Sequence, residues 1–250
     1  GAEPQTLQVD ITRSKAVDDN AFSVELATIV ENSFNIHQDG NRLVFREEEN
    51  PRAKLMACAR NDKLFADGSD QAQLAKQVRY VIGGTDEVAK TFRVIALPKS
   101  WQTDPWSSLD ESEQPERWDD RLPILVLPEE PENLDARLGR WLKDHLQKRR
   151  NTVRFLMPRA GSTNAFQDRD LLIFARAEMK AQEWSGQSPE YKKLHTEYQG
   201  LLRDNLKKRF DRFAVLQRWN FADPAQCRFS VESLKKQGAQ IPEGIEEALI

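Results

Sequence analysis

Val-Ile-Ala-Leu-Pro (residues 94–98), Ile-Leu-Val-Leu-Pro (124–128) and Val-Arg-Phe-Leu-Met-Pro (153–158) are the stretches that decide the fold. Their closing prolines stand thirty residues apart, which fits a strand followed by a crossover. The first two are apolar almost throughout, as expected of parallel strands buried on both faces. Between the second and third, apolar residues at helical spacing over 134–146 predict a crossover helix. We therefore predict an α/β fold with a Rossmann-like, mostly parallel sheet and flanking helices.

The residues before these runs predict helices and one hairpin. Apolar side chains recur at helical spacing over 18–32, where Asp19 or Asn20 can cap the helix. An Asp-Gly pair within residues 34–46 supplies the positive φ angles of a tight turn and predicts a β-hairpin. Asn50, followed by a proline, predicts the N-cap of a further helix, and Asp70 predicts the cap of another.

The residues after the third run are predicted to be mainly helical. Two periodic segments, 170–184 and 189–216, predict a long antiparallel helical hairpin. An alternating strand candidate at 227–231 and a short helix after Pro242 follow. We expect three parts: an α/β domain (1–166), the helical hairpin (167–218) and a small strand and helix segment (219–250). Because the chain starts at Gly1 and stops within a predicted helix, we expect a truncated last part and a longer parent protein.

The gap between the first two runs has a different composition. Residues 99–120 carry seven acidic groups and half of the six tryptophans, so we predict a long surface loop. Aromatic side chains dominate binding hot spots, which makes Trp101, Trp106 and Trp118 candidates for docking a partner. The alternative is that these tryptophans pack the loop against its own sheet.

Charge is distributed unevenly along the chain. The net charge is −3, but residues 148–218 carry +8 and the remainder −11. The positive segment contains two clusters of cations, which are candidates for binding phosphate or an acidic protein face. The first is Lys148, Arg149, Arg150, Arg154 and Arg159, and the second is Lys207, Lys208, Arg209, Arg212 and Arg218. Helix capping is the alternative for the first cluster, and a solvated helix face is the alternative for the second.

Several kinds of chemistry lack their motif. Without Gly-Lys-Ser or Gly-Lys-Thr there is no P-loop, so we expect neither a bound cofactor nor ATP hydrolysis from this chain alone. Its three histidines have no partner at metal-ligand spacing. The two cysteines, Cys58 and Cys227, are interpreted as buried thiols in a reducing compartment. No apolar run approaches the length of a membrane span, so we expect no membrane partner. The acidic pair Glu129 and Glu130 follows a predicted strand; we favour a solvated pair of loop carboxylates, with a metal-dependent, nuclease-like site as the alternative.

Several stretches together resemble a known family. They are residues 41–46 (NRLVFR), 50–51 (NP), 59–65 (ARNDKLF), 124–128 (ILVLP) and 148–158 (KRRNTVRFLMP). They are similar to the region downstream of the nucleotide-binding core in large AAA+-type ATPases of bacterial phage-defence islands, including BREX-type systems. The resemblance spans residues 34–250 and includes no catalytic motif, so it assigns no active-site residue.

The resemblance implies a cytoplasmic accessory module whose parent protein binds ATP and magnesium. Its partners would be the remainder of that ATPase and other defence-island proteins, with DNA as a further candidate. Our first hypothesis is therefore a non-catalytic module that mediates partner contacts or couples nucleotide state. The alternative is a DNA-binding module that uses the basic helical hairpin. A metal-dependent nuclease-like enzyme is the least favoured of the three.

Overall fold

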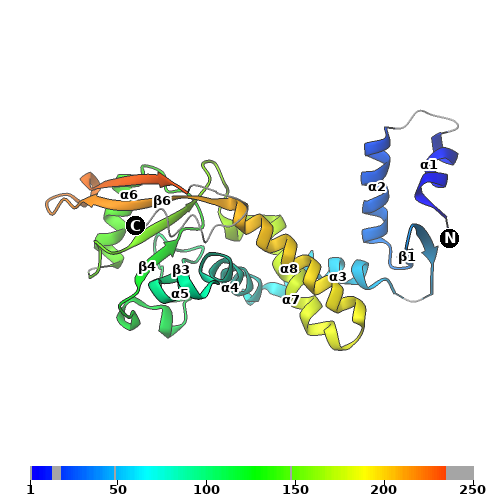
Figure 1. Cartoon of the computed structure of the whole chain (residues 1–250), viewed down its shortest axis with the longest axis horizontal. Coiled ribbons are helices and arrows are strands. Elements are labelled where there is room, and N and C mark those ends of the chain that lie inside the picture. Colours follow the sequence, from blue (N-terminus) through cyan, green and yellow to red (C-terminus); the bar gives the residue numbers. More distant parts are fainter. Residues whose placement is uncertain (1, 13–17, 48, 147, 235–250) are drawn as a thin grey trace. The chain divides into compact units, whose positions relative to one another are not determined.

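The structure, a computed structural model, describes residues 2–12, 18–47, 49–146 and 148–234 (Figure 1). The chain divides into two units, Gly1–Ser69 with Arg176–Gln199, and Asp70–Ala175 with Gly200–Ile250. This grouping differs from the sequence-based division at residues 166 and 218. The boundaries of the units fall at the start of α4 (Ser69–Gly83) and within α7 (Arg169–Glu183) and α8 (Pro189–Arg209). The mixed α/β class is confirmed.

The first unit contains the predicted hairpin and helices. Its N-terminal elements are α1 (Pro4–Thr12), α2 (Asp19–Asn32), β1 (Ile36–Asp39), β2 (Arg42–Phe45), α3 (Pro51–Ala59) and the 3-10 turn η1 (Asp62–Phe65). Strands β1 and β2 pair antiparallel around Gly40, whose φ of 59° is the left-handed conformation that the turn requires. The Asn50 side chain caps α3 by accepting the Arg52 N–H, as predicted. The cap of α2 is Asp18, one residue before the predicted position.

The second unit is built on a five-stranded sheet. Its strands are β3 (Phe92–Ala96), β4 (Leu122–Val126), β5 (Arg154–Pro158), β6 (Phe210–Arg218) and β7 (Arg228–Ser233). They lie in chain order, β3-β4-β5-β6-β7, with β3, β4 and β5 parallel and β6 and β7 antiparallel. The three proline-terminated runs thus form the three parallel strands. A Rossmann-like sheet is not confirmed, because two of the four pairings are antiparallel and the order of the described strands never reverses.

Helices complete the second unit. α5 (Asp86–Thr91) precedes β3, and α6 (Leu134–His145) is the predicted crossover helix between β4 and β5. Helix α4 begins at Ser69, whose N–H and hydroxyl are both bonded to the Asp67 carboxylate. Asp70 therefore lies in the first turn and is not the predicted cap. The predicted strand near the end of the described residues is β7, whereas the helix expected after Pro242 lies outside them.

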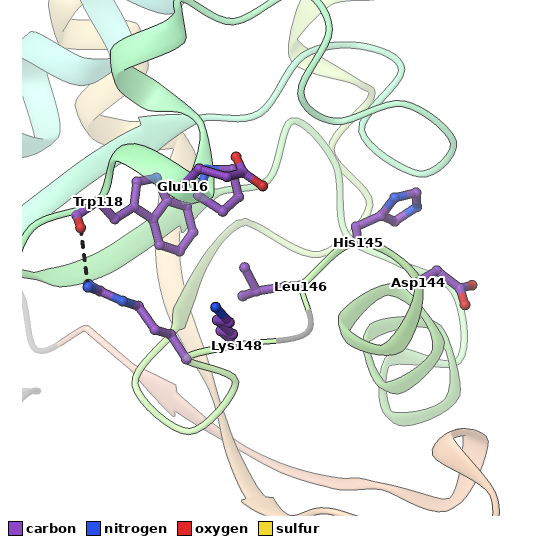
Figure 2. A pocket seen from close by; sticks show the side chains of 8 residues that line it. Glu116, Trp118, Asp144, His145, Leu146 and Lys148 are labelled. Carbon is purple, nitrogen blue, oxygen red and sulfur yellow. Dashed lines mark hydrogen bonds between the residues drawn. The ribbon is translucent and has the colours of Figure 1, made fainter.

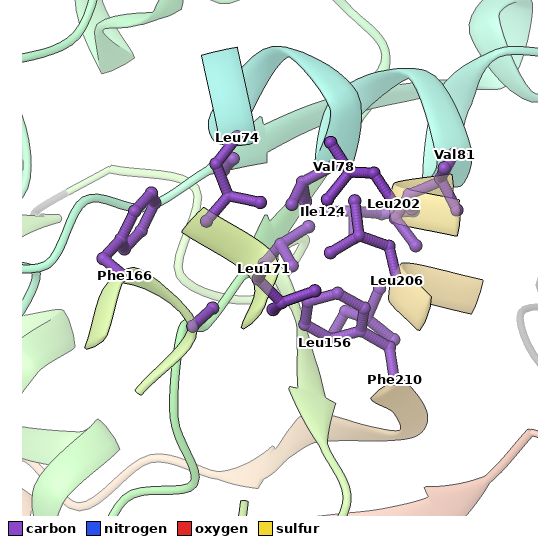
Figure 3. Packing of buried hydrophobic residues seen from close by; sticks show 14 of the residues in the cluster. Leu74, Val78, Val81, Ile124, Leu156, Phe166, Leu171, Leu202, Leu206 and Phe210 are labelled. Atoms are coloured by element: carbon purple, nitrogen blue, oxygen red, sulfur yellow. The ribbon is translucent and has the colours of Figure 1, made fainter. Parts of the chain in front are cut away.

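Successive residues of the central strands enter two separate apolar clusters. Ile124 and Leu156 face a cluster formed with α4, α7 and α8 (Figure 3), while Leu125 and Phe155 face a cluster formed with α6 and the loop before β4. All four side chains are at most 1% exposed. This alternation follows from the pleat of a strand, which sends consecutive side chains to opposite faces. Helices or loops must therefore cover both faces of the sheet.

The predicted helical hairpin over 167–218 is wrong in its last nine residues. Helix α8 ends at Arg209, and the chain continues as β6, paired with β5. Phe210 and Phe213 are both 1% exposed in the same cluster, although they are three positions apart. A regular strand would put them on opposite faces, but the register shift of a β-bulge opposite Pro158 restores the shared face. The bulge therefore reproduces helical spacing within a strand.

We expect the Phe213→Ala substitution to destabilise the second unit by about 3 to 5 kcal/mol, because it empties a buried ring position. The control is Phe221→Ala, which truncates a ring that is 90% exposed and should change stability by no more than about 0.5 kcal/mol. Urea unfolding followed by tryptophan fluorescence measures the difference. Equal losses in the two variants would contradict the placement of β6 in the core.

Candidate functional site

The polar groups at the carboxyl ends of the parallel strands hold the connecting loops together. The Glu129 carboxylate, just after β4, accepts hydrogen bonds from Trp101 Nε1, Gln102 Nε2 and Asn164 Nδ2, each at 3.1 Å. Trp101 is fully buried and Asn164 is 6% exposed. Burying an indole or amide N–H without a partner is costly, so this carboxylate satisfies donors from the loops that follow β3 and β5. Its three bonds indicate a structural role.

Glu130 is also bonded within the protein. Its Oε1 accepts from Arg212 Nη1 at 3.0 Å, and the same guanidinium donates to the Pro158 carbonyl at 2.8 Å. Among the described residues, no group of three or more His, Cys, Asp or Glu side chains could hold a metal ion. Both carboxylates of the pair thus accept hydrogen bonds from side chains of the protein itself.

The histidines and cysteines lie on separate elements. His37 is on β1, His145 at the end of α6 and His195 on α8. Cys227 is buried as predicted, but Cys58 on α3 is only partly buried. Desolvation raises the pKa of the Cys58 thiol, which disfavours its reactive thiolate form.

Two of the loop tryptophans, Trp101 and Trp118, belong to the core, and Trp106 is partly buried and packs against it. Trp101 is 0% and Trp118 is 6% exposed, and the Trp106 ring packs at 5.7 Å from Trp141 of α6. The Trp106 and Trp118 indoles donate to backbone carbonyls of His145 (3.1 Å) and of residue 113 (2.8 Å). A docking surface needs exposed rings, so the burial of these rings favours the alternative that they pack the loop on its own sheet.

The second basic cluster does not form one free face. Arg209 pairs with Asp168 at 2.9 Å, and Arg212, bonded to Glu130, is on β6 and not on a helix. Lys207 lies 3.7 Å from Asp204. Of the cations that this cluster has on α8, Lys208 is the one with an exposed side chain. Carboxylates distant in sequence thus neutralise the two arginines.

The first cluster separates in a similar way. Arg150 donates to the Leu146 carbonyl at 2.9 Å, which matches the capping alternative, and stacks 4.5 Å from the Trp219 ring. Arg154 donates to two nearby backbone carbonyls. Arg159 lies 3.7 Å from Asp211 and is distant in sequence from α6. Lys148 and Arg149 remain exposed at the end of the helix.

A pocket of about 570 Å³ lies at this point (Figure 2). Glu116 and Trp118 of the loop, Asp144 and His145 at the end of α6, and Lys148 and Arg149 beyond it are among the residues that line the pocket. The Arg149 guanidinium donates to the Trp118 carbonyl at 3.2 Å and to the next carbonyl, so the loop holds this side chain in place. The structure therefore brings together candidates from the basic cluster and from the tryptophan loop.

Asp119 anchors the loop beside this pocket. Its carboxylate accepts hydrogen bonds from Arg121 at 2.9 Å and from Arg93 at 2.9 Å. These bonds, with Arg121 the larger cause, hold the pKa of Asp119 well below its usual range. The carboxylate consequently stays ionised, and its partners fix the position of the backbone that receives Arg149.

The exposed face of α6 adds three cations that sequence reasoning missed. Arg137, Arg140 and Lys143 are exposed at intervals of three residues, opposite the buried side chains of the helix. We group these three with Lys148 and Arg149, which follow the helix in the chain and are also exposed, and call the five residues the basic surface. Within the described part of the chain, none of its five members forms an ion pair with a carboxylate. Their helical spacing was visible in the sequence and could have identified the three.

Comparisons with known proteins assign no family. No protein-family model, curated protein or solved structure matches the chain. None of the described helices combines the length and the apolar character needed to cross a membrane. Residue geometry and charge are therefore the basis for any functional conclusion.

We expect Glu129→Ala to destabilise the second unit by about 1 to 3 kcal/mol, because buried donors lose their acceptor. Glu132→Ala is the matched control, since it removes an exposed carboxylate from the same loop and should cost no more than about 0.5 kcal/mol. Chemical denaturation measures both. A variant of unchanged stability that loses a divalent-metal-dependent nuclease activity would contradict the structural role.

Proposed function

We propose that this chain is a non-catalytic binding module that holds an anionic partner on its basic surface. The observation that supports the proposal is a group of five exposed cations that have no carboxylate partner among the described residues, on a chain whose net charge is −3. Many other cations in the described chain do have partners, including Arg79 with Glu113 and Arg228 with Asp135. Single exposed lysines such as Lys76 and Lys99 also lack a carboxylate partner within the described residues, but here five such cations follow one another along one helix and the residues just after it.

Unpaired like charges on one helix carry a free-energy cost. Cations three or four residues apart destabilise a helix by roughly 0.2 to 0.5 kcal/mol per pair. The pairs Arg137 with Arg140 and Arg140 with Lys143 have this spacing. An anionic partner would relieve the repulsion, and the field of the surface would steer it toward the site.

The setting of this module follows from the family resemblance. We propose an accessory role in a large cytoplasmic phage-defence ATPase, where the parent protein binds ATP and magnesium. Contacts with the remainder of that ATPase or with other defence proteins would then transmit its nucleotide state. The exclusion of ATP hydrolysis by the chain itself rests on the missing Gly-Lys-Ser or Gly-Lys-Thr sequence.

The other two hypotheses lose their geometric basis. Binding of DNA by the helical hairpin would use Arg209 and Arg212, which are committed to Asp168 and Glu130. A nuclease-like site would use Glu129, whose oxygens accept three bonds from neutral donors. The basic surface of α6 is therefore the favoured binding site.

Retention on heparin, a polyanion, tests the proposal. We expect the chain to be retained despite its net negative charge, and the variant R137A/R140A/K143A to elute at a clearly lower salt concentration. The variant K207A/K208A/R218A removes the same number of charges from α8 and β6 and should elute close to the wild type. Equal elution of the two variants, or no retention of the wild type, would overturn the proposal.

A further inference from the structure

We infer that the anionic partner of the basic surface is the phosphate backbone of duplex nucleic acid. This inference rests on the function proposed above and names the class of partner. It depends on the burial of the large apolar side chains of α6, on the burial of the Trp118 indole at the pocket, and on the type and spacing of the cations.

The apolar side chains of α6 face the sheet and not the solvent. Leu138, Trp141 and Leu142 are at most 3% exposed, and they pack in the cluster with Phe155. The core of a protein-protein interface is formed by apolar and aromatic groups and is depleted of charge. The solvent face of α6 has the opposite character. Nucleic-acid interfaces are more polar and far more positively charged, which favours nucleic acid over an acidic protein.

The same burial disfavours a single strand. Proteins that bind single-stranded nucleic acid stack the bases on accessible aromatic rings. The indole that lines the pocket, Trp118, is only 6% exposed and is held by its own hydrogen bond. A duplex needs no such platform, because its bases are already stacked and its phosphates face outward.

The spacing of the cations suits a continuous row of phosphates. Successive members on α6 are separated by about 4.5 Å along the helix axis, three residues at 1.5 Å each. Lys148 and Arg149 continue the charge beyond the end of the helix, at the pocket. Three of the five members are arginines, whose planar fork binds phosphate in a bidentate manner. The only carboxylate between Arg137 and Arg149 is Asp144.

Fluorescence anisotropy with a labelled 20-base-pair DNA duplex of arbitrary sequence tests the inference. We expect dissociation constants of about 1 to 100 micromolar at physiological salt, as for binding to the backbone alone. Five phosphate contacts predict a slope of log affinity against log salt near about −4.5, and R137A/R140A/K143A should reduce it to about −1.8. K207A/K208A/R218A should keep the wild-type slope.

Two further probes separate this inference from the proposed function. A labelled single strand of the same sequence should bind more weakly than the duplex, and a labelled polyglutamate peptide should bind more weakly still. If the chain is retained on heparin but does not bind the duplex, the inference of a duplex partner is wrong and the proposed anion-binding function is unaffected. The same conclusion holds if polyglutamate or the single strand binds more tightly than the duplex. Duplex affinity unchanged in R137A/R140A/K143A would also overturn this inference. If the chain binds neither heparin nor the duplex, both proposals fail. Circular dichroism confirms that each variant is folded.

Discussion

The burial of β5 on both faces is the constraint on which the second unit depends. Phe155 and Met157 enter one apolar cluster and Leu156 enters the other, and all three are at most 1% exposed. A strand in this position needs a covering layer on each side. Helices α4, α7 and α8 supply side chains to one cluster, and α6 with the tryptophan loop supplies them to the other. Most of the polar groups of these covering elements are therefore left on their outer faces, away from the sheet.

Because α6 must cover the sheet, its polar residues have only the solvent face available. That face carries Arg137, Arg140 and Lys143. Lys148, just after the helix, lines the same pocket as residues of the tryptophan loop. The loop itself is fixed by its buried rings and by the bonds to Glu129. The packed layer therefore sets the backbone positions of the cations, and hydrogen bonds to the loop also hold the Arg149 side chain.

Local patterns predicted much of this structure, and long-range contacts explain the failures. The parallel strands, the hairpin and the Asn50 cap depend on neighbouring residues, so sequence alone identified them. Strand β6 was missed because the bulge opposite Pro158 gives Phe210 and Phe213 a helical spacing. The basic clusters were defined by adjacency in the chain, whereas Arg209 is neutralised by Asp168, a residue of another element. Counting charge by helical face would have revealed the surface on α6.

Acetylation footprinting of lysines tests the central claim most directly, because it locates a bound duplex on the unmodified protein. Lys143 and Lys148 belong to the basic surface, whereas Lys208, which is also exposed, lies on α8. Saturating duplex should slow the acetylation of Lys143 and Lys148 and leave the rate at Lys208 unchanged. Protection of Lys208 without protection of Lys143 and Lys148 would contradict the assignment of the binding surface to α6.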